Sequence, residues 1–264
     1  MKLVSLLSLG LLLSSSAAIA HTPYLVSPQF QVRPGATVTL DAAFAETFFV
    51  PEVVFAGPQF TVTGPDGQRR PIDTVQAFKQ RSVAEHTLPA QPGTYRFSTG
   101  IRHGAVFRSY QLGGKKVSVR DDEHVIPADA TDVDIFQALT RAETYVTAGA
   151  PDHGALAPHG QGLELQAMTH PSDLYTGEPV RLRVLFDGKP VAGQSVQLSP
   201  AVWSSDASTQ ALTLHADAQG VVQWPAARAG TWLVLARHRA AAPVGAPVPA
   251  YSHSYTLTFQ VLNP

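Results

Sequence analysis

The chain has 264 residues, with 19 lysines and arginines against 20 aspartates and glutamates, and a formal net charge of −1. No basic run is longer than Arg69-Arg70 or Lys115-Lys116, which argues against a nucleic-acid partner, because phosphate binding needs clustered basic side chains. Cysteine is absent, which excludes disulfides and thiolate metal sites, so any metal ion must be bound by histidine, carboxylate, amide or amine groups.

Residues 1–20 have the pattern of a cleaved signal peptide. Lys2 supplies a positive charge, residues 3–13 are mostly apolar, and Ala18 and Ala20 are small residues at positions −3 and −1 of a cleavage site. The apolar run is too short to span a bilayer, and nothing later reaches that length. The sequence therefore predicts an exported, soluble, periplasmic protein whose mature chain begins at His21.

An N-terminal histidine offers two nitrogen ligands from one residue. The free α-amine and the imidazole Nδ1 of His21 together can chelate a divalent transition metal ion. The alternative is that His21 merely follows the cut, at a frayed terminus.

Residues 21–120 form the first predicted domain, a β-sandwich. Residues 36–44 and 94–98 alternate polar and apolar side chains, which is typical of half-buried strands, and strands are also expected at 59–63 and 116–120. Together with frequent prolines and glycines, this spacing predicts an all-β fold.

Residues 121–161 differ in character and are predicted to be a connector. Within it, residues 132–140 are expected to form a short helix, residues 144–147 a strand, and residues 149–162 a loop.

Residues 162–264 form the second predicted sandwich. Asp187-Gly188 is a hairpin turn sequence, and Trp224 and Trp232 are expected in the core. The expected strands are residues 162–168, 180–186, 195–198, 211–215, 221–224, 231–236 and 254–261.

An ordered series of short sequence motifs in the connector and second domain resembles a known protein family. They are residues 141–151, 160–165, 169–179, 185–193, 217–220, 224–232 and 255–259. The series resembles a family of exported bacterial proteins of formally unknown function that is linked to nickel and cobalt uptake. The resemblance implies tandem immunoglobulin- or transthyretin-like sandwiches in the periplasm that capture or deliver a transition metal.

The first half departs from the resemblance at one point. Members often carry an aromatic pair near carboxylates and a histidine after the first strand. Here Phe48 and Phe49 lie between Glu46 and Glu52 without a histidine. A glutamate would then replace the histidine ligand.

The candidate metal ligands are His21, Glu46, His86 and His103. All four lie in the first domain, and loop tips at one end of a sandwich can converge. His86 lies on an alternating run and His103 in an expected turn at residues 101–104. For each histidine alone, a solvated surface position is the alternative.

Three further histidines have structural interpretations. His153 and His159 are expected to be polar residues of a flexible loop, and a secondary low-affinity metal site is the alternative. His170 is expected to make a structural hydrogen bond within the turn that contains Ser172 and Asp173.

No catalytic motif is present, and the sequence predicts a binding protein and not an enzyme. A histidine brace also supports copper oxidative chemistry, but no aromatic platform for a substrate is evident. The predicted function is binding or delivery of nickel or cobalt, or of copper, with a membrane transporter or an outer-membrane receptor as partner. The alternative is a structural or adhesive envelope module that binds a glycan or protein without metal.

Overall fold

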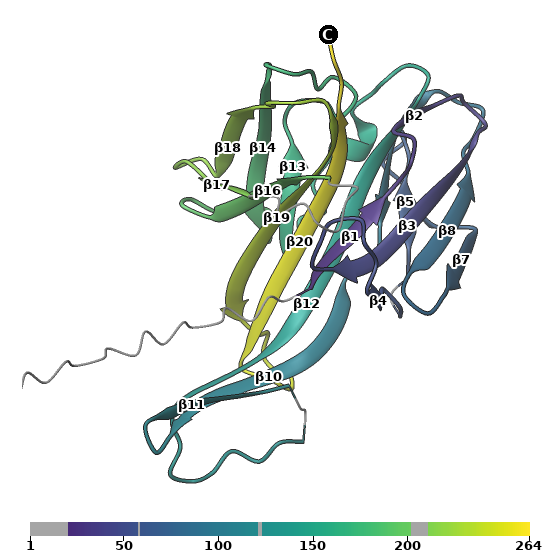
Figure 1. The fold of residues 1–264 in the computed structure, drawn as a ribbon. Coiled ribbons are helices and arrows are strands. Elements are labelled where there is room, and N and C mark those ends of the chain that lie inside the picture. Colours follow the sequence, from purple (N-terminus) through teal and green to yellow (C-terminus); the bar gives the residue numbers. More distant parts are fainter. Residues whose placement is uncertain (1–20, 58, 121–122, 202–210) are drawn as a thin grey trace, which may run out of the picture.

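The computed structural model describes residues 21–57, 59–120, 123–201 and 211–264, and the predicted signal peptide lies outside these ranges. Within them the protein is all-β, which confirms the predicted fold class (Figure 1). The strands form three sheets, and the helical structure of the described ranges is limited to the 3-10 turn η1 (Gly154–Leu156).

The first sheet has five strands in the described ranges, in the order β1-β3-β8-β7, with β4 paired to β3. All of its pairings are antiparallel. Its strands are β1 (Thr22–Val26), β3 (Thr37–Ala45), β4 (Val53–Val54), β7 (Thr74–Ala77) and β8 (Ser82–Thr87). The alternating sequence predicts β3, whereas β1 is not among the strands that the sequence predicts.

The second sheet runs through the whole molecule. Its order within the described residues is β17-β16-β19-β20-β12-β9-β5-β6, and β2 and β10 also pair with β12 while β11 pairs with β10. Its eleven strands are β2 (Gln31–Val32), β5 (Thr61–Thr63), β6 (Arg69–Pro71), β9 (Gly93–Ser98), β10 (Arg102–Leu112), β11 (Lys115–Val119), β12 (Thr131–Ala148), β16 (Ser195–Pro200), β17 (Leu212–His215), β19 (Gly230–Ala241) and β20 (Ala250–Val261).

The third sheet covers the C-terminal half. Its strands are β13 (Leu163–Ala167), β14 (Pro179–Phe186), β15 (Lys189–Pro190) and β18 (Val221–Pro225). The predicted turn at Asp187-Gly188 joins β14 to β15, and both residues have positive φ angles of 49° and 74°. Positive φ at both central residues is the backbone of a two-residue hairpin turn that matches the twist of its strands.

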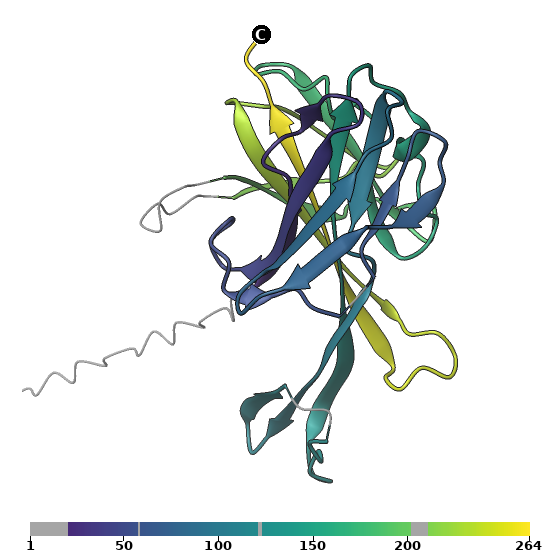
Figure 2. The ribbon, with the colours of Figure 1, turned by 90° about the vertical axis from the view of Figure 1, so that its right-hand side faces the viewer.

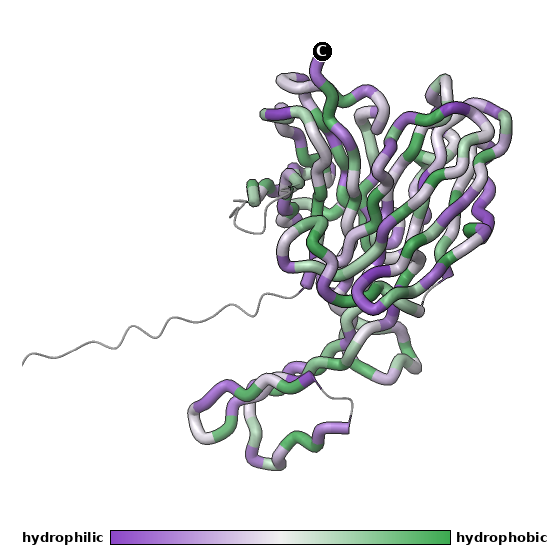
Figure 3. The backbone as a smooth tube through the Cα atoms, turned by 45° about the vertical axis from the view of Figure 1, so that its right-hand side comes forward, coloured by the Kyte–Doolittle hydropathy of each residue, from purple (hydrophilic) through white to green (hydrophobic). Residues whose placement is uncertain are grey.

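Each smaller sheet packs on the long sheet and encloses its own core. The first core joins β1, β3 and β8 to β5, β9 and β12, and the second joins β13, β14 and β18 to β16, β19 and β20. Trp224 and Trp232 are 3% and 6% exposed in the second core, as predicted. Figure 3 shows hydrophobic and hydrophilic positions alternating along the strands of this body.

Strand β12 belongs to both sandwiches. Its neighbouring residues Tyr145 and Val146 lie in different cores, because successive side chains of a strand point to opposite faces. The strand pairs with β9 on the first-domain side and runs parallel to β20 on the second-domain side. The helix that the sequence predicts at residues 132–140 is therefore wrong, because β10 and β20 supply strand partners there.

A third apolar cluster lies between the first sheet and β19. It joins Tyr24, Val26 and Ala45 to Leu233 and Leu235, whereas the residues between the two leucines and beside them face the second core. The hydroxyl of Thr258 donates a hydrogen bond of 2.5 Å to the Leu25 carbonyl, which ties β20 to β1. Strand β1 is thus held by its pairing with β3 and by this contact with β20.

An arm made by β10, β11 and the start of β12 projects from the body in both views (Figures 1 and 2). On it, the rings of Phe107 and Phe136 stack with centroids 5.2 Å apart. The guanidinium of Arg239 lies over Phe136, 3.9 Å from the ring centroid. These contacts join the arm to the tip of the β19–β20 hairpin.

Among the described residues, no helix has the length and apolar character needed to traverse a lipid bilayer.

Candidate metal centre

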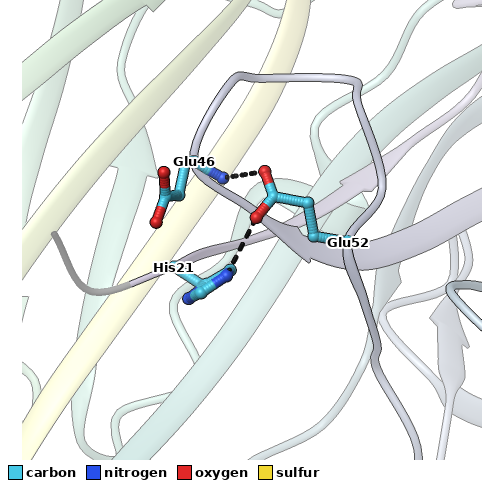
Figure 4. A group of neighbouring side chains, drawn as sticks. All are labelled: His21, Glu46 and Glu52. Atoms are coloured by element: carbon cyan, nitrogen blue, oxygen red, sulfur yellow. Dashed lines mark hydrogen bonds and ion pairs between the residues drawn. The ribbon is translucent and has the colours of Figure 1, made fainter.

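Three potential metal ligands meet where β1 begins. His21, Glu46 and Glu52 each offer one ligand atom, and these atoms lie within 4.8 Å of one another. Figure 4 shows the Glu46 side chain directed toward the imidazole and the Glu52 carboxylate on its other side. Imidazole and carboxylate groups at this separation form a donor set for a divalent cation.

The register between β1 and β3 explains the meeting of the first two ligands. The strands are antiparallel with Thr22 opposite Ala45. One step outward along both strands sets His21 against Glu46, and directly opposed residues of an antiparallel pair have neighbouring side chains.

The loop 46–52 brings Glu52 back to the same place. Its two phenylalanine rings stack on each other, and each meets the ring of Tyr24 edge-on at 5.9 Å. Tyr24 itself is 1% exposed on β1, so the aromatic contacts fix the loop to the strand that carries the histidine. The Glu46 amide donates to Glu52 Oε1 at 2.9 Å and closes the loop.

The contact between His21 and Glu52 fixes the role of each imidazole nitrogen. His21 Nε2 lies 2.9 Å from Glu52 Oε2. In the neutral imidazole, Nε2–H donates to the carboxylate and the lone pair remains on Nδ1. Metal-binding histidines are commonly oriented in this way by a carboxylate on the other nitrogen.

The site is open to solvent, because the side chains of His21 and Glu52 are 40% and 34% exposed. A histidine at a free N-terminus would add its amine to Nδ1, and the Glu46 carboxylate would supply an oxygen. Nitrogen and oxygen ligands of this kind suit nickel, cobalt, copper and zinc. The residues present therefore fit a divalent transition metal ion.

Two of the predicted ligands lie elsewhere. His86, on β8, contacts Asp73 with Nδ1 3.1 Å from Oδ2. His103 is on strand β10 opposite Leu139, and not in a turn as predicted, with its ring edge-on to Tyr251 at 5.9 Å. Neither belongs to the three-residue group found in the described part of the chain.

Glu52 is the member of the group that is absent from the predicted ligands. The sequence pattern shows Glu52 only as a substitute for a histidine in the 46–52 region. The spacing that would have identified it as a partner of His21 depends on the loop geometry, which no local sequence signal encodes.

The sequence does not reveal a second polar cluster, which lies on the same face of β12 as Tyr145 and so on the side of the second core. Glu143 is fully buried on β12 and contacts His159 Nε2 at 2.7 Å and the hydroxyl of Tyr255. Burial alone would raise the pKa of Glu143, but the His159 charge and hydrogen bond and the Arg96 guanidinium hold it well below its usual range. His159 lies in the predicted loop, but its side chain is only 10% exposed and contacts the buried Glu143.

His153 and His170, the two remaining histidines that were given structural interpretations, have structural contacts. The ring of His153 packs edge-on against that of His170 at 5.2 Å. His170 Nδ1 accepts a hydrogen bond from the Ser172 amide at 3.2 Å, which confirms the predicted hydrogen bond within this turn. Its Nε2 donates to the Asp152 carbonyl at 2.8 Å.

Comparison with solved structures finds similar β-rich chains at low identity. The D0-D1 domain of intimin is 12% identical, covers 89% of this chain and 96% of its own, and has a TM-score of 0.23. The Escherichia coli adhesin FdeC is 14% identical over 94% of this chain and 66% of its own, with a TM-score of 0.24. Trypsin-activated alpha-2-macroglobulin from Escherichia coli is 14% identical over 91% of this chain, which spans only 16% of that protein, with a TM-score of 0.25.

These TM-scores are too low to carry an argument about function. Comparison with curated protein sequences gives no match. A family model described as a domain of unknown function matches residues 18–240, which is most of the chain. The chain therefore belongs to the DUF4198 family.

Proposed function

We propose that this protein is a non-enzymatic periplasmic component that binds a divalent transition metal ion, nickel or cobalt in preference and copper as a further candidate, and delivers it to an uptake system. The observation that carries the proposal is the meeting of His21, Glu46 and Glu52 at the start of β1. The resemblance to exported proteins linked to nickel and cobalt uptake supports the choice of metals.

The proposal requires cleavage between Ala20 and His21. The small residues Ala18 and Ala20 favour a cut at this bond, and it would free the α-amine of the residue whose imidazole already faces two carboxylates. An amine and Nδ1 of one residue close a chelate ring without bringing together separate parts of the chain. Chelation therefore costs little conformational entropy.

Each residue has a separate role in the proposed site. The amine and Nδ1 of His21 bind the ion, and the Glu46 carboxylate adds a negatively charged oxygen ligand. Glu52 accepts from Nε2–H and so keeps the imidazole in the tautomer that binds metal. The exposed position leaves the ion accessible to a membrane transporter or an outer-membrane receptor, as delivery requires.

Calorimetric titration with nickel tests the proposal on two forms of the protein. One begins at His21 with a free α-amine, and the other has the same sequence with that amine acetylated. The first should bind one ion, and the second should bind at least about tenfold more weakly, because acylation of the amine removes one ligand and its chelate ring. Cobalt and copper should show the same dependence on the free amine.

Glu46→Gln in the form that begins at His21 should also weaken nickel binding, by about tenfold, since it replaces a charged oxygen ligand by a neutral one. Glu178→Gln is the matched control, because Glu178 is an exposed glutamate far along the chain and outside the group. Absence of nickel, cobalt and copper binding in both N-terminal forms would refute the proposed function and leave the module that binds a glycan or protein.

A further inference from the structure

A cavity of about 280 Å³ adjoins the candidate metal centre. It lies between the end of β3 with its following loop and the strands β16 and β19. The residues that the argument uses are Glu46, Phe48, Gln197, Ser199, Leu233 and Leu235. Glu46 belongs to both the cavity and the metal group, so an ion bound by its carboxylate lies at the cavity wall.

The lining of the cavity is mixed in polarity. Phe48, Leu233 and Leu235 supply apolar surface, and Gln197 and Ser199 supply neutral hydrogen-bonding groups. Glu46 is the one charged residue among the described residues that line it. A hydrated ion alone would leave the apolar surface unused. A ligand with several free carboxylates would find no cationic side chain among the described residues of the lining.

The proposed site leaves some coordination positions of the ion free for a second molecule. The proposed site supplies three donor atoms, two from His21 and one from Glu46, whereas nickel and cobalt commonly take more than four. The remaining positions can be filled by a small chelator. The cavity is smaller than the roughly 300–1,000 Å³ of sites for drug-sized ligands, which limits the chelator to about the size of one amino acid.

We propose that the ion is bound here as a one-to-one complex with an α-amino acid, whose amine and carboxylate remain on the metal and whose apolar side chain occupies the cavity. This inference rests on the proposed function and names its substrate. A complex of a divalent ion with one amino-acid anion carries a net positive charge, which suits the Glu46 and Glu52 carboxylates. No bond is formed or broken other than metal coordination.

The experiment compares nickel alone, nickel with equimolar glycine, and nickel with equimolar L-leucine, titrated into the protein that begins at His21. Glycine and leucine present the same chelating atoms and differ in the side chain. The leucine complex should bind at least about tenfold more tightly than the glycine complex, because its side chain leaves water for the apolar wall. Leucine without nickel should not bind.

A variant that fills the cavity tests the role of the cavity separately from that of the metal ligands. Ser199→Trp places a large ring in the cavity from β16 and changes no proposed ligand. It should keep the affinity for nickel alone and lose the preference for leucine. Ser195→Trp is the matched control, because Ser195 is an exposed serine on the same face of β16 and does not line the cavity.

The outcomes distinguish the inference from the function on which it rests. Nickel binding with equal affinities for the free ion and both complexes would overturn the inference and leave the proposed function standing. Removal of nickel from the protein by leucine would overturn it as well. A leucine preference that survives Ser199→Trp would place the side chain elsewhere and refute the cavity assignment. No binding in any sample would overturn both.

Discussion

Glu143 is a fully buried carboxylate on the second-core face of β12. Its oxygens accept from the Tyr255 hydroxyl and contact His159 Nε2, and the Arg96 Nε lies 3.9 Å away. Burial raises the pKa of Tyr255 well above its usual value, so this hydroxyl stays protonated and donates. The cluster links β12, β9, β20 and the loop before β13 at one residue.

Glu143→Gln should destabilise the protein by about 3–5 kcal/mol, because it leaves the buried Arg96 guanidinium without its counter-charge. Urea unfolding at neutral pH measures the change. Glu178→Gln, at an exposed position, should shift the free energy of unfolding by less than about 0.5 kcal/mol. Equal effects of the two substitutions would contradict the role given to Glu143.

The same residue predicts a dependence on pH. The pKa of Glu143 is lower in the folded protein than the roughly 4.3 of an unfolded glutamate, so the folded state favours the ionised form. The stability from this group is complete above the unfolded value and is lost as the pH falls through the acid range toward the folded value. Glu143→Gln should therefore show a smaller loss of stability on acidification below about pH 4.3 than the wild type.

At the scale of secondary-structure elements, pairing between strands that are distant in the sequence determines whether an ambiguous segment becomes a helix or a strand. Residues 132–140 contain the alternating set Val133, Ile135 and Leu139, but a short run of this kind fits a helix or a strand until its partners are known. The partners, β10 and β20, come from far earlier and far later in the chain. Local alternation sufficed for β3, β9 and β14 because each has one polar and one apolar set of positions, whereas β19 was predicted from a continuous apolar run that is buried on both faces.

The candidate metal centre likewise combines what local sequence indicates with what only strand pairing determines. His21 follows from the cleavage pattern, and Glu46 from the acidic and aromatic segment after β3. Their proximity depends on the β1–β3 register, which a sequence of mostly apolar β1 residues does not display. His103 was expected at a loop tip, and its strand assignment results from pairing with β12.

Phe136→Ala tests whether the arm is held by its aromatic contacts. It removes the stack on Phe107 and the contact with Arg239, each worth about 0.5–1.5 kcal/mol. Hydrogen exchange of β10 and β11 amides should accelerate by about tenfold, while exchange in β14 stays unchanged. Val133→Ala, at a 48% exposed position on the same strand, is the control and should change neither. Unchanged hydrogen exchange in the arm would show that backbone pairing alone, without the aromatic contacts, keeps the arm ordered.

At the scale of the whole molecule, the long sheet makes the two sandwiches one mechanical body. Strand β12 contributes Val146 to the first core and Tyr145 to the second, and it cannot leave one sandwich without disrupting the other. Two sandwiches that share a strand in this way are expected to unfold in a single cooperative step, as a small single domain does.

Leu40→Ala in the first core should therefore also lower the stability of the second core. Leu40 is fully buried, and its truncation should cost about 2–5 kcal/mol. Tryptophan fluorescence in a Trp203→Phe background reports Trp224 and Trp232, which both lie in the second core. The fluorescence and circular dichroism midpoints in urea should fall together, and Leu165→Ala in the second core should give the same coincidence. A fluorescence midpoint unchanged by Leu40→Ala would show two independent units.

Under the proposed function, the β1–β3 register would also determine when the protein can take up its metal ion. The nitrogen ligands come from one side of that pairing and the Glu46 oxygen from the other, so an unfolded chain does not hold them together. Under the proposed cleavage, the amine is also blocked until the leader is removed. Loading with metal would then be the last step, after translocation, processing and folding. The choice among competing ions would be made by the supply in the compartment where folding finishes, and not by the supply in the cytoplasm where the chain is made.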